Sequence, residues 1–466
     1  MSMQATGKQR QTTTGKVAEE ILAFTVGRDP DLDLALVEAD CIGTAAHAVM
    51  LAALPGPRRV LTAAQKDRVI RELLRIIELA RAGRFKIRMR DQDVHMAVDR
   101  VLMARLGDVG RRIHTASSRN DQVAVDLRLY AKEQLHGLMD ETASLAGGLL
   151  RFAKRHDRTP MVGRTHMQPA MPSTVGLWAA AHAESLLDDV TLVRGAYDYN
   201  DRSPLGSAAG YGVPMPIDRA LTARLLGFQG PIRNVLYASH TRGKCETIVL
   251  GAVSQVMLSL SRLAADMILY TLPELGYFRL APEHGTGSSI MPQKNNPDVL
   301  ELVRARTAMV LGWSAGAGAV LSGLPGGYNR DLQETKEPFL RGLETARACL
   351  RVMRLVIDGL KADRAALGKG FTPQVFAAEK ALELVARGVP FRTAYRRVKE
   401  HLDELREGDL LRPAAGKDGP AAPRAPDLPA LENRVRTVKK FVAGKRKVYH
   451  KALSKLLGTE YPKLRG

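Results

Sequence analysis

The segment Thr286-Gly-Ser-Ser-Ile-Met-Pro-Gln-Lys-Asn-Asn-Pro-Asp298 is the stretch around which the rest of the chain is organised. Gly285 and Gly287 flank its first hydroxyl group, and Pro292 and Pro297 each have a fixed φ, so we expect a shaped loop rather than a regular helix or strand. Its Ser, Lys and Asn side chains are of the kinds that loops on a rigid scaffold present for binding and catalysis. An ordinary Gly/Pro-rich connection has the same composition, so the rest of the chain must decide between the two.

The composition predicts an all-α fold. The chain has 466 residues, of which 45% are hydrophobic and only 5% aromatic, and its richness in Ala, Leu and Arg suits helix packing. Patterned apolar segments predict long helices over residues 123–150, 173–197, 246–272, 299–320 and 336–360, each roughly 35 Å long at ~1.5 Å per residue. Several are apolar nearly all round, which in a soluble protein indicates burial among other helices. A symmetric oligomer would cover the apolar faces that one chain leaves open.

Changes in composition divide the chain into five regions. We expect a disordered arm over residues 1–16, an N-terminal helical domain over 17–113, a central bundle of long helices over 114–362, a small C-terminal helical domain over 363–411, and a Pro/Ala linker with a basic tail over 412–466.

Charge is concentrated at the end of the chain. The formal net charge is +20, and residues 434–466 hold seven lysines and four arginines against the single acid Glu460. The moderately basic remainder suits an anionic substrate. For the tail two interpretations stay open, a solvated and partly helical surface segment, or a segment that contacts nucleic acid.

Three cysteines, Cys41, Cys245 and Cys349, are far apart and have neither disulfide-framework nor metal-site spacing. No apolar signal segment follows the first basic residues. The uncharged run 247–261 is shorter than the ~20 residues that span a bilayer. We therefore expect a cytoplasmic protein without a membrane segment.

Three polar loops, over residues 114–122, 159–172 and 286–298, each concentrate hydroxyl, amide and cationic side chains. Structural explanations exist for single members, since His166 could be a core histidine and Ser118, Thr165 or Thr286 a helix cap. Together they form a donor-rich set suited to carboxylates, and proton abstraction beside a carboxylate needs such fixed donors. Acyl transfer lacks the third member of a triad and a Gly-x-Ser-x-Gly elbow.

Several motifs occur in a fixed order along the chain. They are Asp93-Val-His95, His114-Thr with Ser118-Arg-Asn-Asp-Gln122, Gly163-x-Thr-His-x-Gln168, Pro204-Leu-Gly-Ser207, Gly287 to Asp298, Tyr328-Asn-x-Asp-Leu-Gln-Glu-x-Lys336 and Gly388-Val-Pro-Phe-Arg392. The Gly287 to Asp298 motif resembles the signature loop of the fumarase/aspartase superfamily. With the other motifs, over about residues 40–392, the chain is most similar to the argininosuccinate lyase family.

The resemblance implies a three-domain fold with a central bundle of long helices, assembled as a homotetramer whose active sites combine loops from three subunits. It implies a dicarboxylate substrate and no cofactor or metal. The implied reaction eliminates an amine from an N-substituted succinate to release fumarate, with argininosuccinate giving arginine and fumarate. The alternative function is the same chemistry on another N-substituted aspartate. A further alternative is a member of the family that has lost its activity and has a structural or binding role.

Carried over position by position, the resemblance assigns roles to individual residues. Ser288 would remove the Cβ proton with its alkoxide stabilised by Lys294, and His166, held by Glu301, would handle the proton of the leaving amine. Which of Ser288 and His166 is acid and which is base stays open. The resemblance assigns substrate binding to Ser118, Arg119, Asn120, Thr165, Asn296, Tyr328, Gln333 and Lys336.

Departures from the family pattern lie mostly on the leaving-group side. Ala116-Ser117 replaces a Gly-Arg pair, Arg164 replaces an aromatic residue, and Ser239 to Cys245 departs from a Ser-Asp-Arg-Asp segment. The linker and basic tail stand in place of a C-terminal Gly-Gly-Thr segment. The bond that is broken is therefore better specified by the sequence than the amine that is released.

Overall fold

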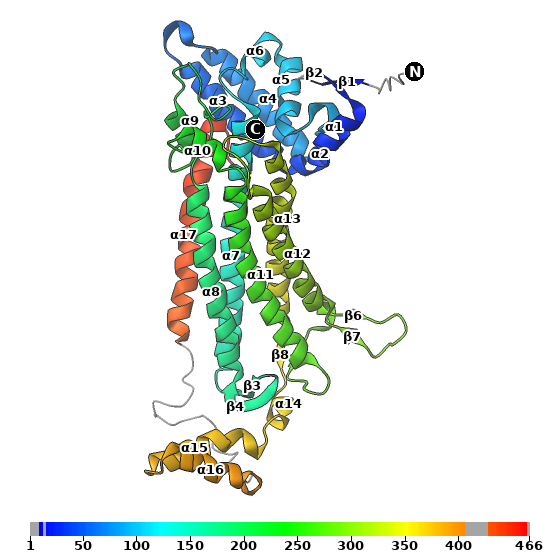
Figure 1. Ribbon diagram of the computed structural model, residues 1–466, viewed down its shortest axis with the longest axis vertical. Coiled ribbons are helices and arrows are strands. Elements are labelled where there is room, and N and C mark those ends of the chain that lie inside the picture. Colours follow the sequence, from blue (N-terminus) through cyan, green and yellow to red (C-terminus); the bar gives the residue numbers. More distant parts are fainter. Residues whose placement is uncertain (1–8, 13–14, 406–426, 464–466) are drawn as a thin grey trace.

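The protein is built on a bundle of long helices (Figure 1). The computed structural model describes residues 9–12, 15–405 and 427–463. Its longest helices are α7 (Arg119–Arg155), α8 (Val175–Asn200), α11 (Lys244–Thr271), α12 (Asp298–Leu321), α13 (Lys336–Gly359) and α17 (Leu428–Leu457). The strands form short two-stranded pairs only, within the residues described. The predicted all-α fold with a central bundle is confirmed.

Helix α7 forms the centre of the bundle. Its N-terminus is fixed by a capping box, in which the Asn120 N–H donates to Ser118 Oγ at 3.2 Å and the Ser118 N–H donates to Asp121 Oδ1 at 3.0 Å. Leu135, Leu138 and other apolar side chains of α7 are completely buried. At ~1.5 Å per residue, its 37 residues span roughly 55 Å. The two ends of the bundle are therefore far apart in one chain.

One end of the bundle carries the N-terminal helices (Figure 1). These are α1 (Glu19–Val26), α2 (Asp29–Leu32), α3 (Val37–Ala53), α4 (Ala63–Arg81), α5 (Val94–Leu106) and α6 (Asp108–Arg112), with short 3₁₀ turns at η1 (Asp33–Leu36), η2 (Gly56–Arg58) and η3 (Met89–Asp91). The small helices α9 (Arg219–Leu225) and α10 (Val235–His240) lie at the same end. Helix α3 is buried along most of its length and packs on α4 and α7.

The opposite end carries a hairpin and the small C-terminal helices. Strands β3 (Pro160–Thr165) and β4 (Gln168–Thr174) pair antiparallel where a loop over 159–172 was expected. Beyond them lie α14 (Arg364–Lys369), η6 (Pro373–Phe376), α15 (Ala377–Ala386), α16 (Phe391–Glu400) and η7 (Leu402–Glu404). Strands β5 (Phe278–Arg279) and β8 (Lys361–Ala362) pair where the bundle joins the small C-terminal helices. Two short 3₁₀ turns lie elsewhere in the chain: η4 (Pro282–His284) follows β5, and η5 (Arg330–Thr335) precedes α13.

The expectation of a disordered arm over residues 1–16 needs correction. In the arm over 1–16, residues 9–12 form β1 (Gln9–Thr12), which pairs with β2 (Gly15–Ala18). Ladder hydrogen bonds come from the backbone, so a polar sequence without apolar periodicity can still pair. Residues 1–8 and the whole of the 412–426 linker fall outside the described residues.

The basic tail, expected as a solvated and partly helical surface segment or as a nucleic-acid contact, is helical and packs on the bundle. Helix α17 runs along α7 and α8 back to the N-terminal end (Figure 1). Leu431, Val442, Tyr449 and Leu453 are buried in this contact. These apolar residues recur at helical spacing among the lysines, which is why a segment of high net charge has a docking face.

Two stretches, 29–53 and 244–271, are long and apolar enough to cross a membrane by length and composition. Within the fold, 78% of the first apolar window and 56% of the second are buried. Packing within the fold therefore accounts for much of this apolarity, as it does for core helices in general.

Candidate active site

Three groups of predicted site residues lie in separate parts of one chain (Figure 1). The first group stands at the N-terminal end of the bundle, around the start of α7 and of α13. The second stands on the β3–β4 hairpin at the opposite end. The third stands on a hairpin formed by β6 (Thr286–Gly287) and β7 (Asn295–Asn296), which projects from the side of the bundle before α12.

The first group is brought together by the fold. Residues far apart in sequence line one cleft with about 310 Å³ of empty space, part of it open to solvent. Its predicted members are Arg119, Asn120, Tyr328, Gln333 and Lys336, and it also contains Asp29, Asp93, Val123 and Arg242. Ser118 caps α7 beside this cleft, so the structural explanation for Ser118 is confirmed, and its role in substrate binding stays a prediction.

Lys336 is held by two acids that sequence reasoning missed. Its ammonium is 2.6 Å from Asp33 Oδ1 and 2.9 Å from Asp29 Oδ2, and the residue is only 2% exposed. Burial raises the pKa of Asp33 to about 6, although the ammonium opposes this shift. Burial also opposes the charge on Lys336, but the two carboxylates outweigh it and raise the pKa of Lys336. The i, i+4 spacing of Asp29 and Asp33 was the available signal.

Arg119 is oriented in the same way. Its Nε donates to Asp93, and its Nη1 donates to Gln92 Oε1 at 3.0 Å. The side-chain amide of Gln333 donates to the Thr25 carbonyl at 3.1 Å. The cations of this cleft are therefore largely neutralised by internal carboxylates, and Asn120 has the uncharged amide group that can donate to a substrate.

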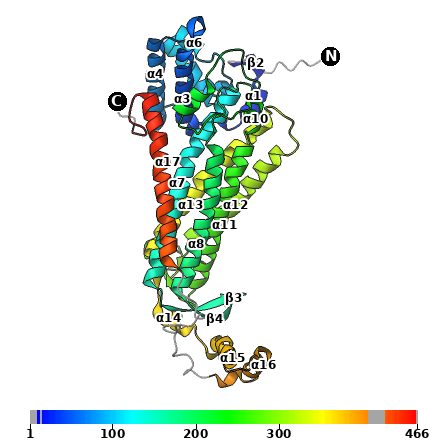
Figure 2. The same cartoon turned by 90° about the vertical axis from the view of Figure 1, so that its left-hand side faces the viewer.

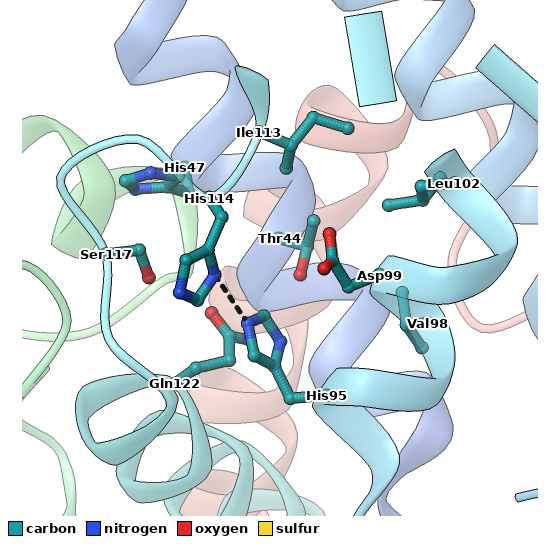
Figure 3. A pocket seen from close by; sticks show the side chains of 10 residues that line it. All are labelled: Thr44, His47, His95, Val98, Asp99, Leu102, Ile113, His114, Ser117 and Gln122. Carbon is teal, nitrogen blue, oxygen red and sulfur yellow. Dashed lines mark hydrogen bonds between the residues drawn. The ribbon is translucent and has the colours of Figure 1, made fainter. Parts of the chain in front are cut away.

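A histidine cluster lies beneath the 114–118 loop (Figure 3). His95 Nδ1 is 2.9 Å from Asp40 Oδ2, and His95 Nε2 is 3.4 Å from His114 Nδ1. Burial lowers the pKa of His95, but the Asp40 carboxylate outweighs burial and raises that pKa to about 9. His47 Nε2 is 2.9 Å from the Thr115 carbonyl oxygen. These contacts fix the loop that leads into Ser118.

His166 stands at the tip of the β3–β4 hairpin. Thr165 pairs with Gln168, which leaves His166 (φ 53°) and Met167 (φ 62°) as the two central residues of the turn. Positive φ at both positions defines a turn that normally uses Asn and Gly, so non-glycine residues here carry strain of the kind found at functional sites. His166 is exposed and not a core histidine.

Ser288 begins the loop of the β6–β7 hairpin. Its Oγ accepts hydrogen bonds from the backbone N–H groups of Ile290 at 3.3 Å and Met291 at 3.1 Å. Lys294 is exposed at the other side of this loop. The expectation of a loop without strands is corrected at its base, because Thr286 pairs with Asn296. The hydroxyl of Thr286 does not accept from a backbone N–H group as a helix cap would, because it donates to the Asp298 carboxylate.

The fold keeps the three groups apart. His166 follows the C-terminal end of α7 and Asn120 lies at its N-terminal end, so the length of that helix, roughly 55 Å, separates them. Within the residues described, no hydrogen bond joins His166 to Glu301, which is exposed on α12. A single chain therefore presents the predicted site residues in three separate places.

Comparison with known proteins indicates the same class of protein as the helical bundle and the sequence motifs of its loops. A family model described as "Lyase" matches residues 38–312. The fold is similar to that of EDDS lyase in complex with formate, at a TM-score of 0.77 and 20% identity over 94% of each chain. It is also similar to a class II fumarase from Schistosoma mansoni, at a TM-score of 0.68 and 15% identity over 87% of this chain and 98% of that one. The fold is thus that of the fumarase/aspartase superfamily.

Relatives at higher identity define the branch. Argininosuccinate lyase from Sorangium cellulosum is 43% identical over 85% of this chain and 91% of its own length. Argininosuccinate lyase from Thermotoga neapolitana is 39% identical over 82% of this chain and 96% of its own length. The chain belongs to the argininosuccinate lyase family, and it is a carbon–nitrogen lyase.

Proposed function

We propose that the protein cleaves argininosuccinate into arginine and fumarate. The reaction removes a proton from Cβ of the succinyl group and expels the amine from the neighbouring carbon. The observation that carries this proposal is the position of Ser288, whose Oγ accepts two backbone N–H groups at 3.3 and 3.1 Å. A serine base needs such donors because the negative charge of its alkoxide must be stabilised.

Ser288 acts as the base in this proposal. The N–H groups of Ile290 and Met291 supply two fixed dipoles, and Lys294, on the same loop, supplies a positive charge. Substrate and neighbouring subunits would cover this exposed hairpin, and the exclusion of water would strengthen each of these interactions. The loop thus supports the formation of the alkoxide without a cofactor.

His166 handles the proton of the leaving amine, with Glu301 of an adjoining subunit as its partner. An imidazole can both give and take a proton in catalysis. The strained turn at φ 53° fixes the histidine at the tip of the hairpin, where it can reach into a site formed by other subunits.

Hydrogen-bond donors to the two succinyl carboxylates come from all three groups. Ser118, Asn120, Gln333 and Tyr328 belong to the cleft at the N-terminal end, Thr165 to the β3–β4 hairpin and Asn296 to the β6–β7 hairpin. Arg119 and Lys336 act within ion pairs that set the charge of the cleft. Several donors are needed because negative charge grows on the carboxylate next to Cβ as the proton leaves.

A homotetramer with shared sites fits this arrangement. Large apolar side chains on the bundle helices are exposed in one chain, among them Leu192, Leu258, Met309 and Leu355. Packing against copies of the same bundle would bury them and bring the three groups of loops together. We propose that this assembly works in the cytoplasm.

The test is a substrate screen with paired serine variants. Fumarate release is followed by its ultraviolet absorbance, with argininosuccinate and a panel of other N-substituted aspartates as substrates. Ser288→Ala should abolish release, whereas Ser289→Ala, the neighbouring serine in the same loop, should retain most of it. Fumarate from another N-substituted aspartate but not from argininosuccinate would assign the alternative substrate. Equal rates for the two variants would refute the assignment of the base.

A further inference from the structure

Helix α17 has two faces of different chemistry. One face packs on α7 and α8 through Leu431, Val442, Tyr449 and Leu453, all of them buried. The other face points to solvent and carries Arg436, Lys440, Lys447, Lys451 and Lys455, all exposed. We call these five residues the basic stripe. Figures 1 and 2 show α17 on the outside of the bundle in both views.

The five cations form one continuous row. Their spacings of four, seven, four and four residues place them within about 100° of the helix circumference, because 3.6 residues make one turn. The row extends roughly 28 Å along the helix axis at ~1.5 Å per residue. Docking of the apolar face on α7 fixes the helix, so the row is held in place before any ligand arrives.

The fold pairs other cations of α17 but not this row. Arg434 is 2.6 Å from Asp188 and Lys439 is 3.0 Å from Asp140, while Lys445 lies 5.7 Å from the centre of the Tyr197 ring, turned toward the bundle. No salt bridge to a member of the basic stripe occurs within residues 9–12, 15–405 and 427–463. The stripe therefore keeps its charge in a protein that already carries a formal net charge of +20.

We propose that the basic stripe is a docking surface for the phosphate backbone of nucleic acid. Phosphate contacts require cations and no base readout, and they supply essentially all of non-specific affinity. A row of roughly 28 Å faces about eight base pairs at 3.4 Å each. The lyase chemistry uses none of these residues, so this binding is an additional property of the protein.

A protein partner or a membrane fits the stripe less well. Lysine is depleted at protein interfaces, which rely on aromatic and apolar anchors. Among the large apolar side chains of α17, only Val448 is strongly exposed, at 67%. A helix that enters a membrane interface needs an exposed apolar face, and the apolar face of α17 is buried in the bundle.

The absence of exposed aromatic rings from α17 also excludes base stacking by this helix, so we expect no preference for single strands.

The experiment measures binding of the full-length assembled enzyme to a fluorescent duplex of random sequence at several salt concentrations. Five phosphate contacts give a slope of about −4.5 for log K against log salt, or about 500-fold weaker binding on going from about 50 to 200 mM salt. The variant Lys440→Ala/Lys447→Ala/Lys451→Ala keeps good helix formers and removes three contacts, so the slope should fall to about −1.8.

The matched control removes three exposed arginines elsewhere, in Arg58→Ala/Arg68→Ala/Arg71→Ala, and should leave the slope unchanged. Fumarate release and circular dichroism of each variant check that the enzyme is intact. Polyglutamate of equal charge and anionic vesicles are the competing ligands, and both should bind more weakly than the duplex. No duplex binding at about 50 mM salt, an unchanged slope in the α17 variant, or tighter binding to either competitor would overturn the proposal.

Discussion

Two inactive variants should restore activity to each other when they assemble together. The change pairs Asn120→Ala, in the cleft at one end of the bundle, with His166→Asn, on the hairpin at the other end. Alone, Asn120→Ala removes a donor to the developing charge and should lower kcat by about 10²–10³. His166→Asn removes a proton-transfer group and should lower it by about 10²–10⁴.

The expected recovery follows from the geometry. Because α7 separates the two residues by roughly 55 Å in one chain, the proposed shared site would take Asn120 from one subunit and His166 from another. In a random equal mixture each of these residues is intact with a probability of one half, so about one quarter of the sites carry both. The co-expressed variants should therefore show about a quarter of the wild-type rate of fumarate release, measured per total enzyme.

A matched pair provides the control. Thr165→Val and His166→Asn change adjacent residues of one hairpin, so every site receives both positions from the same subunit. Co-expression of this pair should give no recovery beyond the activity of the separate variants. A site built within a single chain predicts no recovery for the Asn120 and His166 pair either, and that result would refute the reasoning.

Three further predictions concern buried ionisable groups. The Asp40 carboxylate outweighs burial and raises the pKa of His95 to about 9, so the ion pair stabilises the fold fully below the unfolded pKa of about 6.5 and this stabilisation is lost as pH rises through 9. The free energy of unfolding in urea should show this decline, and His95→Asn should remove it. Burial lowers the pKa of His136 to about 4, and neither ring nitrogen has a hydrogen-bond partner among the residues that the structure describes. Protonation of His136 therefore opposes folding as pH falls from about 6.5. His136→Phe should move acid unfolding, followed by circular dichroism, to lower pH, and an unchanged midpoint would contradict this. Lys132→Met should cost about 3–5 kcal/mol in urea unfolding because it strands the Asp201 carboxylate that now lies 2.5 Å from the ammonium; Lys132→Met with Asp201→Leu should regain most of the loss, and additive losses would argue against the pairing.

The helical architecture could be predicted from the chain because apolar periodicity and punctuation by Gly and Pro are local signals. Predicted helices over 173–197 and 336–360 correspond to α8 and α13. The β3–β4 hairpin was missed because its loop is rich in proline and polar residues, and backbone pairing does not require alternating apolar side chains. Helix α17 was taken for a tail because net charge obscured an apolar face at helical spacing.

The candidate site was predictable in its chemistry and not in its arrangement. Ser288, His166 and Asn120 stand out by residue type and motif. The hydrogen bonds to Ser288 Oγ depend on the φ and ψ angles of a turn, and the position of Asp33 beside Lys336 depends on packing between segments some 300 residues apart. Neither has a local signature in the sequence.

The sequence by itself determined the class of fold, the chemistry of the loops and the bond that is broken, because these depend on residue types and short-range patterns. The tertiary structure decided which of the loops one chain can bring together. A continuous helix of 37 residues fixes the distance between its ends, so that Asn120 and His166 of one chain cannot meet. It also decided that the last basic segment is a docked helix with one free charged face, since burial of an apolar face is a property of the whole bundle.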